Sequence, residues 1–293
     1  MKKLCIYHGN CADGFGAAYA VWKALGDDVE FHPGVYQDPP PDVTGRDVIL
    51  VDFSYKLPVL EEMAKTARTI TILDHHKSAA EDLVHFANPD LMAMAFSEFA
   101  NVAEVEVFLP IRALFDMERS GVMIAWNYFH HDTPPPKLFE HIQDRDLWRF
   151  KLPGTRAIQA ALFSYPYDFE VWERLIDSFD EAGATRLLDE GSAIERKHFK
   201  DIDELLKVVT VRMTIGGHEV PCANLPYTMS SDAGHQLAQG RPFAACYWYT
   251  PGGTVFSLRS TEQGLDVSEI AKQYGGGGHR NAAGFKLAPG ATL

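Results

Sequence analysis

The fold is decided by residues 69–76, which read Thr-Ile-Thr-Ile-Leu-Asp-His-His. Five residues of high strand propensity are followed at once by an acid and two imidazoles. Two earlier stretches repeat the pattern, since residues 4–7 lead to His8 and residues 48–51 lead to Asp52. Continuous apolar strands that alternate with helical stretches predict a doubly wound parallel sheet, covered by helices on both faces.

Polar residues therefore follow three strands of the predicted sheet. The carboxyl ends of parallel strands meet at one edge, so we expect His8, Asp52 and the triplet Asp74-His75-His76 to converge there with Asp13, which follows the first strand. A mixed set of imidazoles and carboxylates suits Mn²⁺, Zn²⁺ or Fe²⁺ better than Mg²⁺ alone. The alternative for single residues is structural: Asp13 and Asp74 could cap helices, and His8 or His76 could be core histidines.

The rest of the chain predicts three segments. Residues 1–182 form the α/β domain, and residues 183–209 are a charged helical connector. Residues 210–293 form a smaller α/β domain, in which short strands flank the turn at Gly216-Gly217.

Composition limits the class of partner. The 293 residues carry 27 Lys and Arg against 40 Asp and Glu, a net charge of −13, which disfavours a protein that coats duplex DNA. No apolar run is long enough to span a membrane, and no signal peptide is visible. The four cysteines show no paired spacing, which is typical of a reducing compartment. We therefore expect a soluble cytoplasmic protein that does not bind membranes.

The chain resembles the DHH phosphoesterases, which include RecJ-type exonucleases, nanoRNases and family II pyrophosphatases. The triplet that names the family is Asp74-His75-His76, and Asp52 matches its lone second-motif aspartate. The remaining motifs are His8 with Cys11-Ala12-Asp13-Gly14, the stretch Asp144-Arg145-Asp146-Leu147-Trp148, and the complete C-terminal signature Gly-Gly-Gly-His-x-x-Ala-Ala-Gly-Phe at residues 276–285. Five motifs in the family's order span nearly the whole chain.

The resemblance implies two divalent cations, usually Mn²⁺, that share Asp52. One ion would be held by His8 and Asp52, and the other by Asp13, Asp52, His75 and a fourth-motif aspartate. His76 would face the phosphoryl group, and Asp74 would orient its neighbours. The catalytic residues would then be His76, Asp52 and Asp74.

Two ligand positions stay open. Asp144 and Asp146 cannot both point the same way on a regular element, and Asp146 is favoured because Phe150 reproduces the family's spacing to an aromatic residue. Cys11 stands where the family has an aspartate. It either binds metal as a thiolate, leaves that role to Asn10, leaves the site weakly occupied until substrate arrives, or is a bystander.

The second domain is expected to bind substrate. Consecutive glycines let backbone N–H groups approach a phosphate or base, and His279 and Arg280 add donors beside Gly276, Gly277 and Gly278. Arg259-Ser260 matches the family's Arg-Ser substrate contact, and Arg suits forked phosphate binding. By the family's arrangement this domain closes over the metal site.

These features predict a metal-dependent phosphodiesterase that hydrolyses short oligoribonucleotides or dinucleotides by two-metal activation of water. Three alternatives remain: a phosphatase of nucleoside bisphosphates, a nucleotide-binding sensor without catalysis, and a pyrophosphatase, which the lack of a Lys/Arg cluster disfavours. The expected partner is a short RNA or dinucleotide rather than duplex DNA, and a homodimer is compatible with the sequence.

Overall fold

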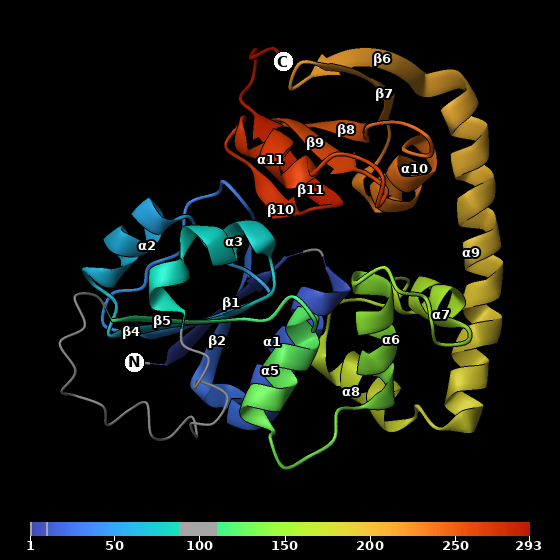
Figure 1. The fold of residues 1–293 in the computed structure, drawn as a ribbon. Coiled ribbons are helices and arrows are strands. Elements are labelled where there is room, and N and C mark those ends of the chain that lie inside the picture. Colours follow the sequence, from blue (N-terminus) through green and yellow to red (C-terminus); the bar gives the residue numbers. More distant parts are fainter. Residues whose placement is uncertain (1, 10, 88–109) are drawn as a thin grey trace. The chain divides into compact units, whose positions relative to one another are not determined.

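The computed structural model describes residues 2–9, 11–87 and 110–293 of the chain. The chain divides into two compact units, Met1–Glu195 and Arg196–Leu293. Each unit is built on its own β-sheet (Figure 1).

The first unit contains a five-stranded sheet in the order β2-β1-β3-β4-β5, and every neighbouring pair of strands is parallel. The strands are β1 (Lys3–His8), β2 (Val29–Gly34), β3 (Asp47–Val51), β4 (Thr69–Asp74) and β5 (Ile111–Phe115). The central strands β3 and β4 are buried over most of their length, and β1 is buried at Leu4, Cys5 and Ile6, because these strands are apolar on both faces. Their carboxyl ends lie at one edge of the sheet, where the polar residues follow.

Helices cover both faces of this sheet. On one face α1 (Ala12–Leu25) and α5 (Gly121–Phe129) lie side by side and pack on Ile49 and Leu73 (Figure 1). On the other face α2 (Leu57–Ala64) packs on Leu50 and Ile72. The unit also contains α3 (Lys77–Asp82), α6 (Lys137–Asp146), α7 (Thr155–Leu162) and α8 (Phe169–Asp177).

The second unit contains a six-stranded sheet in the order β10-β11-β9-β8-β7-β6, which is antiparallel except for the β7–β8 pair. Successive residues of β8 (Ala244–Thr250) pack in two different cores: Ala245 packs with α11 (Val267–Lys272), and Cys246 packs with α10 (Ser230–Leu237). The elements are β6 (Thr210–Ile215), β7 (His218–Asn224), α10 (Ser230–Leu237), β8 (Ala244–Thr250), β9 (Gly253–Arg259), α11 (Val267–Lys272), β10 (Gly277–His279) and β11 (Ala282–Leu287).

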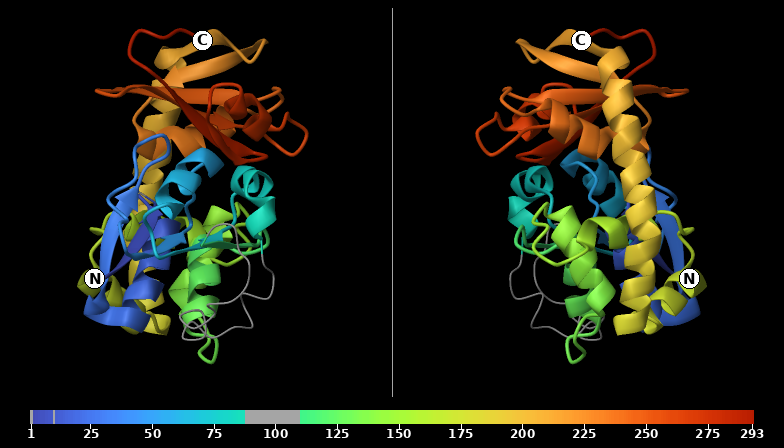
Figure 2. Two further views of the ribbon diagram at one scale, coloured as in Figure 1. Left: turned by 90° about the vertical axis from the view of Figure 1, so that its left-hand side faces the viewer. Right: turned by 90° about the vertical axis from the view of Figure 1, so that its right-hand side faces the viewer.

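The division between the units falls inside α9 (Glu181–Val209), a single helix of 29 residues (Figure 2). No described helix is both long enough and apolar enough to cross a membrane. The predicted fold class is confirmed, because a parallel sheet with helices on both faces is followed by a smaller α/β unit. The strands β2 and β5 were not predicted.

Candidate metal centre

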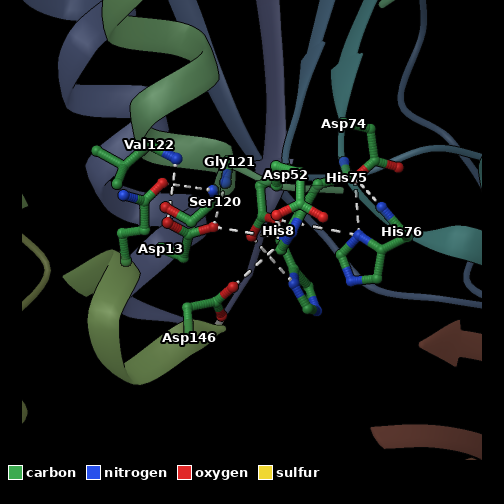
Figure 3. Close-up of polar contacts among 12 residues, drawn as sticks. His8, Asp13, Asp52, Asp74, His75, His76, Ser120, Gly121, Val122 and Asp146 are labelled. Atoms are coloured by element: carbon green, nitrogen blue, oxygen red, sulfur yellow. Dashed lines mark hydrogen bonds and ion pairs between the residues drawn. The ribbon is translucent and has the colours of Figure 1, made fainter. Parts of the chain in front are cut away.

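Three parallel strands bring the polar residues together at the carboxyl edge of the first sheet (Figure 3). His8 ends β1, Asp52 follows β3, and Asp74 ends β4, directly before His75 and His76. The buried side chains of Asp52 and His75 lie at the centre of this cluster.

Asp52 contacts a histidine through each carboxylate oxygen. Nε2–H of His75 donates to Oδ1 at 3.0 Å, and Nδ1 of His8 lies 3.4 Å from Oδ2. Burial alone would raise the pKa of Asp52, but the bonds from His75 and His8 outweigh it and hold that pKa far below its usual range. The backbone of Asp52 has a φ of +53°, a conformation that costs free energy in a residue with a side chain and that clusters at functional sites.

Asp13 connects the cluster to the N-terminus of α5. Its carboxylate accepts the backbone N–H groups of Gly121 and Val122, at 2.5 and 3.0 Å, and lies 3.6 Å from Nε2 of His75 (Figure 3). Burial, with the nearby charges of Asp146 and Asp52, raises the pKa of Asp13. Two N–H groups of a helix terminus thus orient a carboxylate that also faces the cluster.

The side chains of Asp146 and Asp144 have different surroundings in the structure. Oδ2 of Asp146 is buried, makes no hydrogen bond to described residues, and lies 3.5 Å from Nε2 of His75. The structure does not bring the other predicted ligand, Asp144, into the cluster, because its carboxylate accepts hydrogen bonds from Lys151 N, Leu152 N and Thr155 Oγ1. Asp144 shapes the chain after α6, whereas Asp146 faces the histidines.

Asp74 organises the two residues that follow it. Its Oδ1 accepts the N–H groups of His75 and His76 at 2.8 and 3.3 Å, and also Nδ1–H of His76 at 2.7 Å. A histidine that donates from Nδ1 keeps a lone pair on Nε2. Asp74 therefore fixes the orientation and the tautomer of the His76 ring.

Cys11 caps α1 through its backbone and contacts His8 with its side chain. Burial raises the pKa of its thiol, and the contact with His8 only partly offsets this effect. Asn10, the other residue considered at this position, lies outside the described residues.

The donor atoms fit divalent cations. Two sets of ligand atoms each lie within 4.8 Å of one another: Asp13, Asp52 and His75 form one, and His8, Asp52 and His76 form the other. Asp52 belongs to both. The buried Asp146 oxygen without a hydrogen-bond partner, and the like charges of Asp13 and Asp146, are features that a cation would stabilise.

Gly121 and Tyr36 also belong to this site. A Cβ atom on Gly121 would lie 2.4 Å from Cβ of Asp52, so only glycine allows α5 to approach Asp52 this closely. The ring of Tyr36 lies 5.3 Å from that of His8 and 5.8 Å from that of His76. Tyr36 lies just after β2, and it was missed because that strand was not predicted from the sequence.

The predicted substrate residues Arg259 and Ser260 lie at the end of β9 in the second unit. The Arg259 guanidinium donates to Ser231 Oγ, Ser257 Oγ and the carbonyl of Leu258 at 2.7 to 3.0 Å. Ser260 Oγ accepts from Asn281 at 2.9 Å. Contacts within the second unit therefore hold both side chains in place.

The glycine-rich element forms the β10–β11 hairpin, in which Gly277 pairs with Gly284 and His279 pairs with Ala282. A Cβ on Gly276 would lie 2.0 Å from a carbonyl of β11, and Gly278 has a φ of +137°. The hairpin backbone itself therefore requires glycine at both positions. Arg280, next in the chain, is exposed and donates to the carbonyl of Gly264.

Comparison with known proteins matches part of the chain to a family model and most of it to an uncharacterized relative. Residues 236–291 match the family model of the DHHA1 domain. An uncharacterized protein of Acanthamoeba polyphaga mimivirus is 33% identical over 308 residues, which cover 96% of this chain. The chain spans 66% of the length of that relative.

A solved structure of a DHH domain shares the fold. The DHH domain of a protein described as a member of the s1p family of ribosomal proteins has a TM-score of 0.55 at 12% identity, and the match covers 97% of this chain and 82% of that one. RecJ of Thermus thermophilus, solved in complex with Mn²⁺, has a TM-score of 0.49 at 14% identity, over 98% of this chain and 49% of RecJ. The chain therefore carries a DHHA1 domain at residues 236–291 and shares the fold of a solved DHH domain.

Proposed function

We propose that the protein is a metal-dependent phosphodiesterase that hydrolyses short oligoribonucleotides or dinucleotides. The observation that carries this proposal is the pair of donor sets that share Asp52. His8, Asp52 and His76 would hold one divalent cation, and Asp13, Asp52, His75 and Asp146 would hold a second, most readily Mn²⁺. Two such cations lower the pKa of a water molecule and neutralise the charge on phosphate oxygens.

The chain's own residues supply orientation. Asp74 holds the His76 ring through Nδ1, so that Nε2 keeps a lone pair for a cation or a proton. The N–H groups of α5 hold Asp13, and the loop after α6 positions Asp146 beside His75. These fixed contacts reduce the reorganisation that a reaction in the site would require.

We assign recognition of the substrate to residues of the DHHA1 domain: Arg259, Ser260, Gly276, Gly277, Gly278, His279 and Arg280. The support is chemical, because a guanidinium and glycine-rich backbone are suited to phosphate and base contacts. The net charge of −13 favours a short single-stranded substrate over duplex DNA. The four cysteines form no disulfide, which supports a reducing compartment such as the cytoplasm.

The test is a panel of labelled RNAs of two to ten nucleotides, cyclic dinucleotides and nucleoside bisphosphates, each assayed with Mn²⁺, Mg²⁺, Zn²⁺ or a chelator. We expect turnover of the shortest RNAs with Mn²⁺, none with chelator, and a loss of about 10³-fold or more for Asp52→Asn. Asp168→Asn is the matched control, because Asn serves equally well at the exposed cap of α8. Exclusive turnover of bisphosphates would replace the proposal with a phosphatase, and binding without turnover would replace it with a sensor.

A further inference from the structure

Tyr36 stands at the edge that carries the metal centre. β2 is the neighbour of β1 and runs parallel to it, so the residues after both strands lie at the same edge. A Cβ on Gly34 would lie 2.9 Å from Cε1 of Phe53, so the glycine leaves room for the Phe53 ring. Tyr36 packs on that ring, with centroids 4.8 Å apart and an interplanar angle of 36°.

The ring also contacts both histidines of one donor set. Tyr36 is edge-to-face with His8 and with His76, at interplanar angles of 64° and 72°. Three aromatic neighbours thus hold a residue that is still 40% exposed. A tyrosine of the hydrophobic core would be fully buried, and a tyrosine in open solvent would not pack against three rings. Tyr36 is therefore neither of these.

The backbone around Tyr36 is a tight turn. Asp38 N–H donates to the carbonyl of Val35 at 3.1 Å, and Gln37 has a φ of +69°. A positive φ at the third residue is the geometry of a type II turn, which normally takes glycine there. The backbone at Gln37 is therefore strained, and this residue belongs to the same turn as Tyr36.

The hydroxyl of Tyr36 makes no hydrogen bond within the described part of the chain. By contrast, His8 faces Asp52, and His76 donates to Asp74. The ordinary pKa of a phenol is about 10, and burial raises the pKa of Tyr36 further, so its hydroxyl keeps the proton at neutral pH and is a hydrogen-bond donor. The Tyr36 hydroxyl is thus a rigid, neutral hydrogen-bond donor at the edge of the site, and it is not bonded to a carboxylate in the described part of the chain.

We propose that the Tyr36 hydroxyl donates a hydrogen bond to a phosphate oxygen of the substrate. This inference rests on the proposed function, in that it assigns a substrate contact to the same site. A donor fixed by packing loses little entropy on binding, and hydrogen bonds to charged oxygens are stronger than neutral ones. Tyr36 is then a substrate-contacting residue that the family motifs do not include.

The test compares Tyr36→Phe with Tyr55→Phe. Both changes remove one hydroxyl from a ring that packs on Phe53, but Tyr55 is buried, at 4.9 Å from Phe53, and its ring pairs with neither histidine. We expect Tyr36→Phe to lower kcat/KM for a dinucleotide about 10- to 100-fold and Tyr55→Phe to change it less than about twofold. Thermal unfolding and Mn²⁺ binding should be unchanged in Tyr36→Phe.

A binding measurement separates this inference from the proposed function. Calorimetry of AMP with the Mg²⁺-loaded protein should give a Kd about tenfold weaker for Tyr36→Phe than for wild type, whether or not the enzyme turns over RNA. If wild type hydrolyses nothing in the panel, the proposed function fails while the AMP comparison still decides the role of Tyr36. Equal kcat/KM and equal AMP affinity in wild type and Tyr36→Phe would overturn the inference. Loss in Tyr36→Ala but not in Tyr36→Phe would also overturn it, in favour of a ring that stacks.

Discussion

At the scale of single residues, Gly121 packs directly against Asp52 in the candidate metal centre. Asp52 lies in a left-handed conformation after β3, and the start of α5 passes directly over it. The carboxylate that both donor sets share is therefore held from one side by the backbone of another element. This arrangement makes the site sensitive to a single methyl group.

Gly121→Ala tests that sensitivity. The added Cβ would lie 2.4 Å from Cβ of Asp52, so either α5 or Asp52 must move. We expect the free energy of unfolding to fall by about 1–3 kcal/mol and the Mn²⁺ affinity to fall about tenfold, measured by urea unfolding and calorimetry. Gly252→Ala is the control, because its Cβ would have no neighbour closer than 3.7 Å. Unchanged affinity in Gly121→Ala would show that the site adapts.

The protonation of the cluster gives a second prediction at this scale. Burial lowers the pKa of His75 and of His8, but the bonds to Asp52 outweigh burial and hold both pKa values above normal. A raised histidine pKa stabilises the fold fully below the unfolded value of about 6.5, and this stabilisation is lost as the pH rises through the folded pKa.

The metal-free protein should therefore lose stability as the pH rises above about 6.5. With chelator present, we expect Tm to fall as the pH rises above about 6.5, and Asp52→Asn to show a weaker fall. Because metal binding requires neutral imidazoles, Mn²⁺ should release protons and restore Tm at the higher pH. Thermal scans in matched buffers measure the effect, and a Tm of the metal-free protein that rises over this range would contradict it.

At the scale of elements, sequence patterns predicted the strands that are continuous apolar runs. β1, β3 and β4 are of this kind, and their ends deliver His8, Asp52 and the Asp74 triplet to one edge. β2 reads Val-Glu-Phe-His-Pro-Gly, in which polar residues and a proline break the run, because an edge strand is only partly covered. β5, at the other edge, carries Arg112. The residues at the end of β2, Tyr36 among them, were accordingly missed.

Periodicity could not decide between Asp144 and Asp146, because the answer depends on the irregular chain between α6 and α7. That chain wraps around Asp144: its carbonyl accepts the N–H groups of Arg149 and Phe150, at 2.8 and 3.1 Å. Trp148 and Phe150 both have positive φ, at +55° and +48°. A loop of this kind follows from hydrogen bonds that only the folded chain reveals.

Asp144→Ala should unravel this loop and disturb the neighbouring Asp146. The change removes the buried acceptor of three hydrogen bonds, from Lys151 N, Leu152 N and Thr155 Oγ1. We expect a loss of about 2–4 kcal/mol in the free energy of unfolding, with weaker Mn²⁺ binding. Asp168→Ala, which removes one exposed bond to Val171 N at the cap of α8, should cost only about 1 kcal/mol and leave Mn²⁺ binding intact. Equal losses in the two variants would contradict a special role for Asp144.

On the scale of the whole molecule, charge is divided unevenly between the two units. Residues 196–293 carry 10 Lys and Arg against 8 Asp and Glu, so the negative charge lies in the unit that contains the metal centre. Outside the candidate metal centre, the first unit repels a polyanion, whereas the second unit, residues 196–293, does not. The division favours a substrate with few phosphates, whose binding depends on local contacts rather than on a field of positive charge.

Salt dependence tests this division. For proteins that bind nucleic acids through a basic surface, added salt weakens binding steeply, because the release of counterions then gains less free energy. Here salt screens a net repulsion, so kcat/KM for a short RNA should stay level or rise from about 20 to about 200 mM NaCl, over which the Debye length shrinks from roughly 20 Å to below 10 Å. The gain should be larger for a decamer than for a dinucleotide, since the longer chain carries more charge past the acidic surface. Initial rates at saturating Mn²⁺ measure the effect, with NaCl replaced by potassium glutamate as a control for specific ions. A steep fall of kcat/KM with salt would reveal a basic binding path that outweighs the net charge of −13.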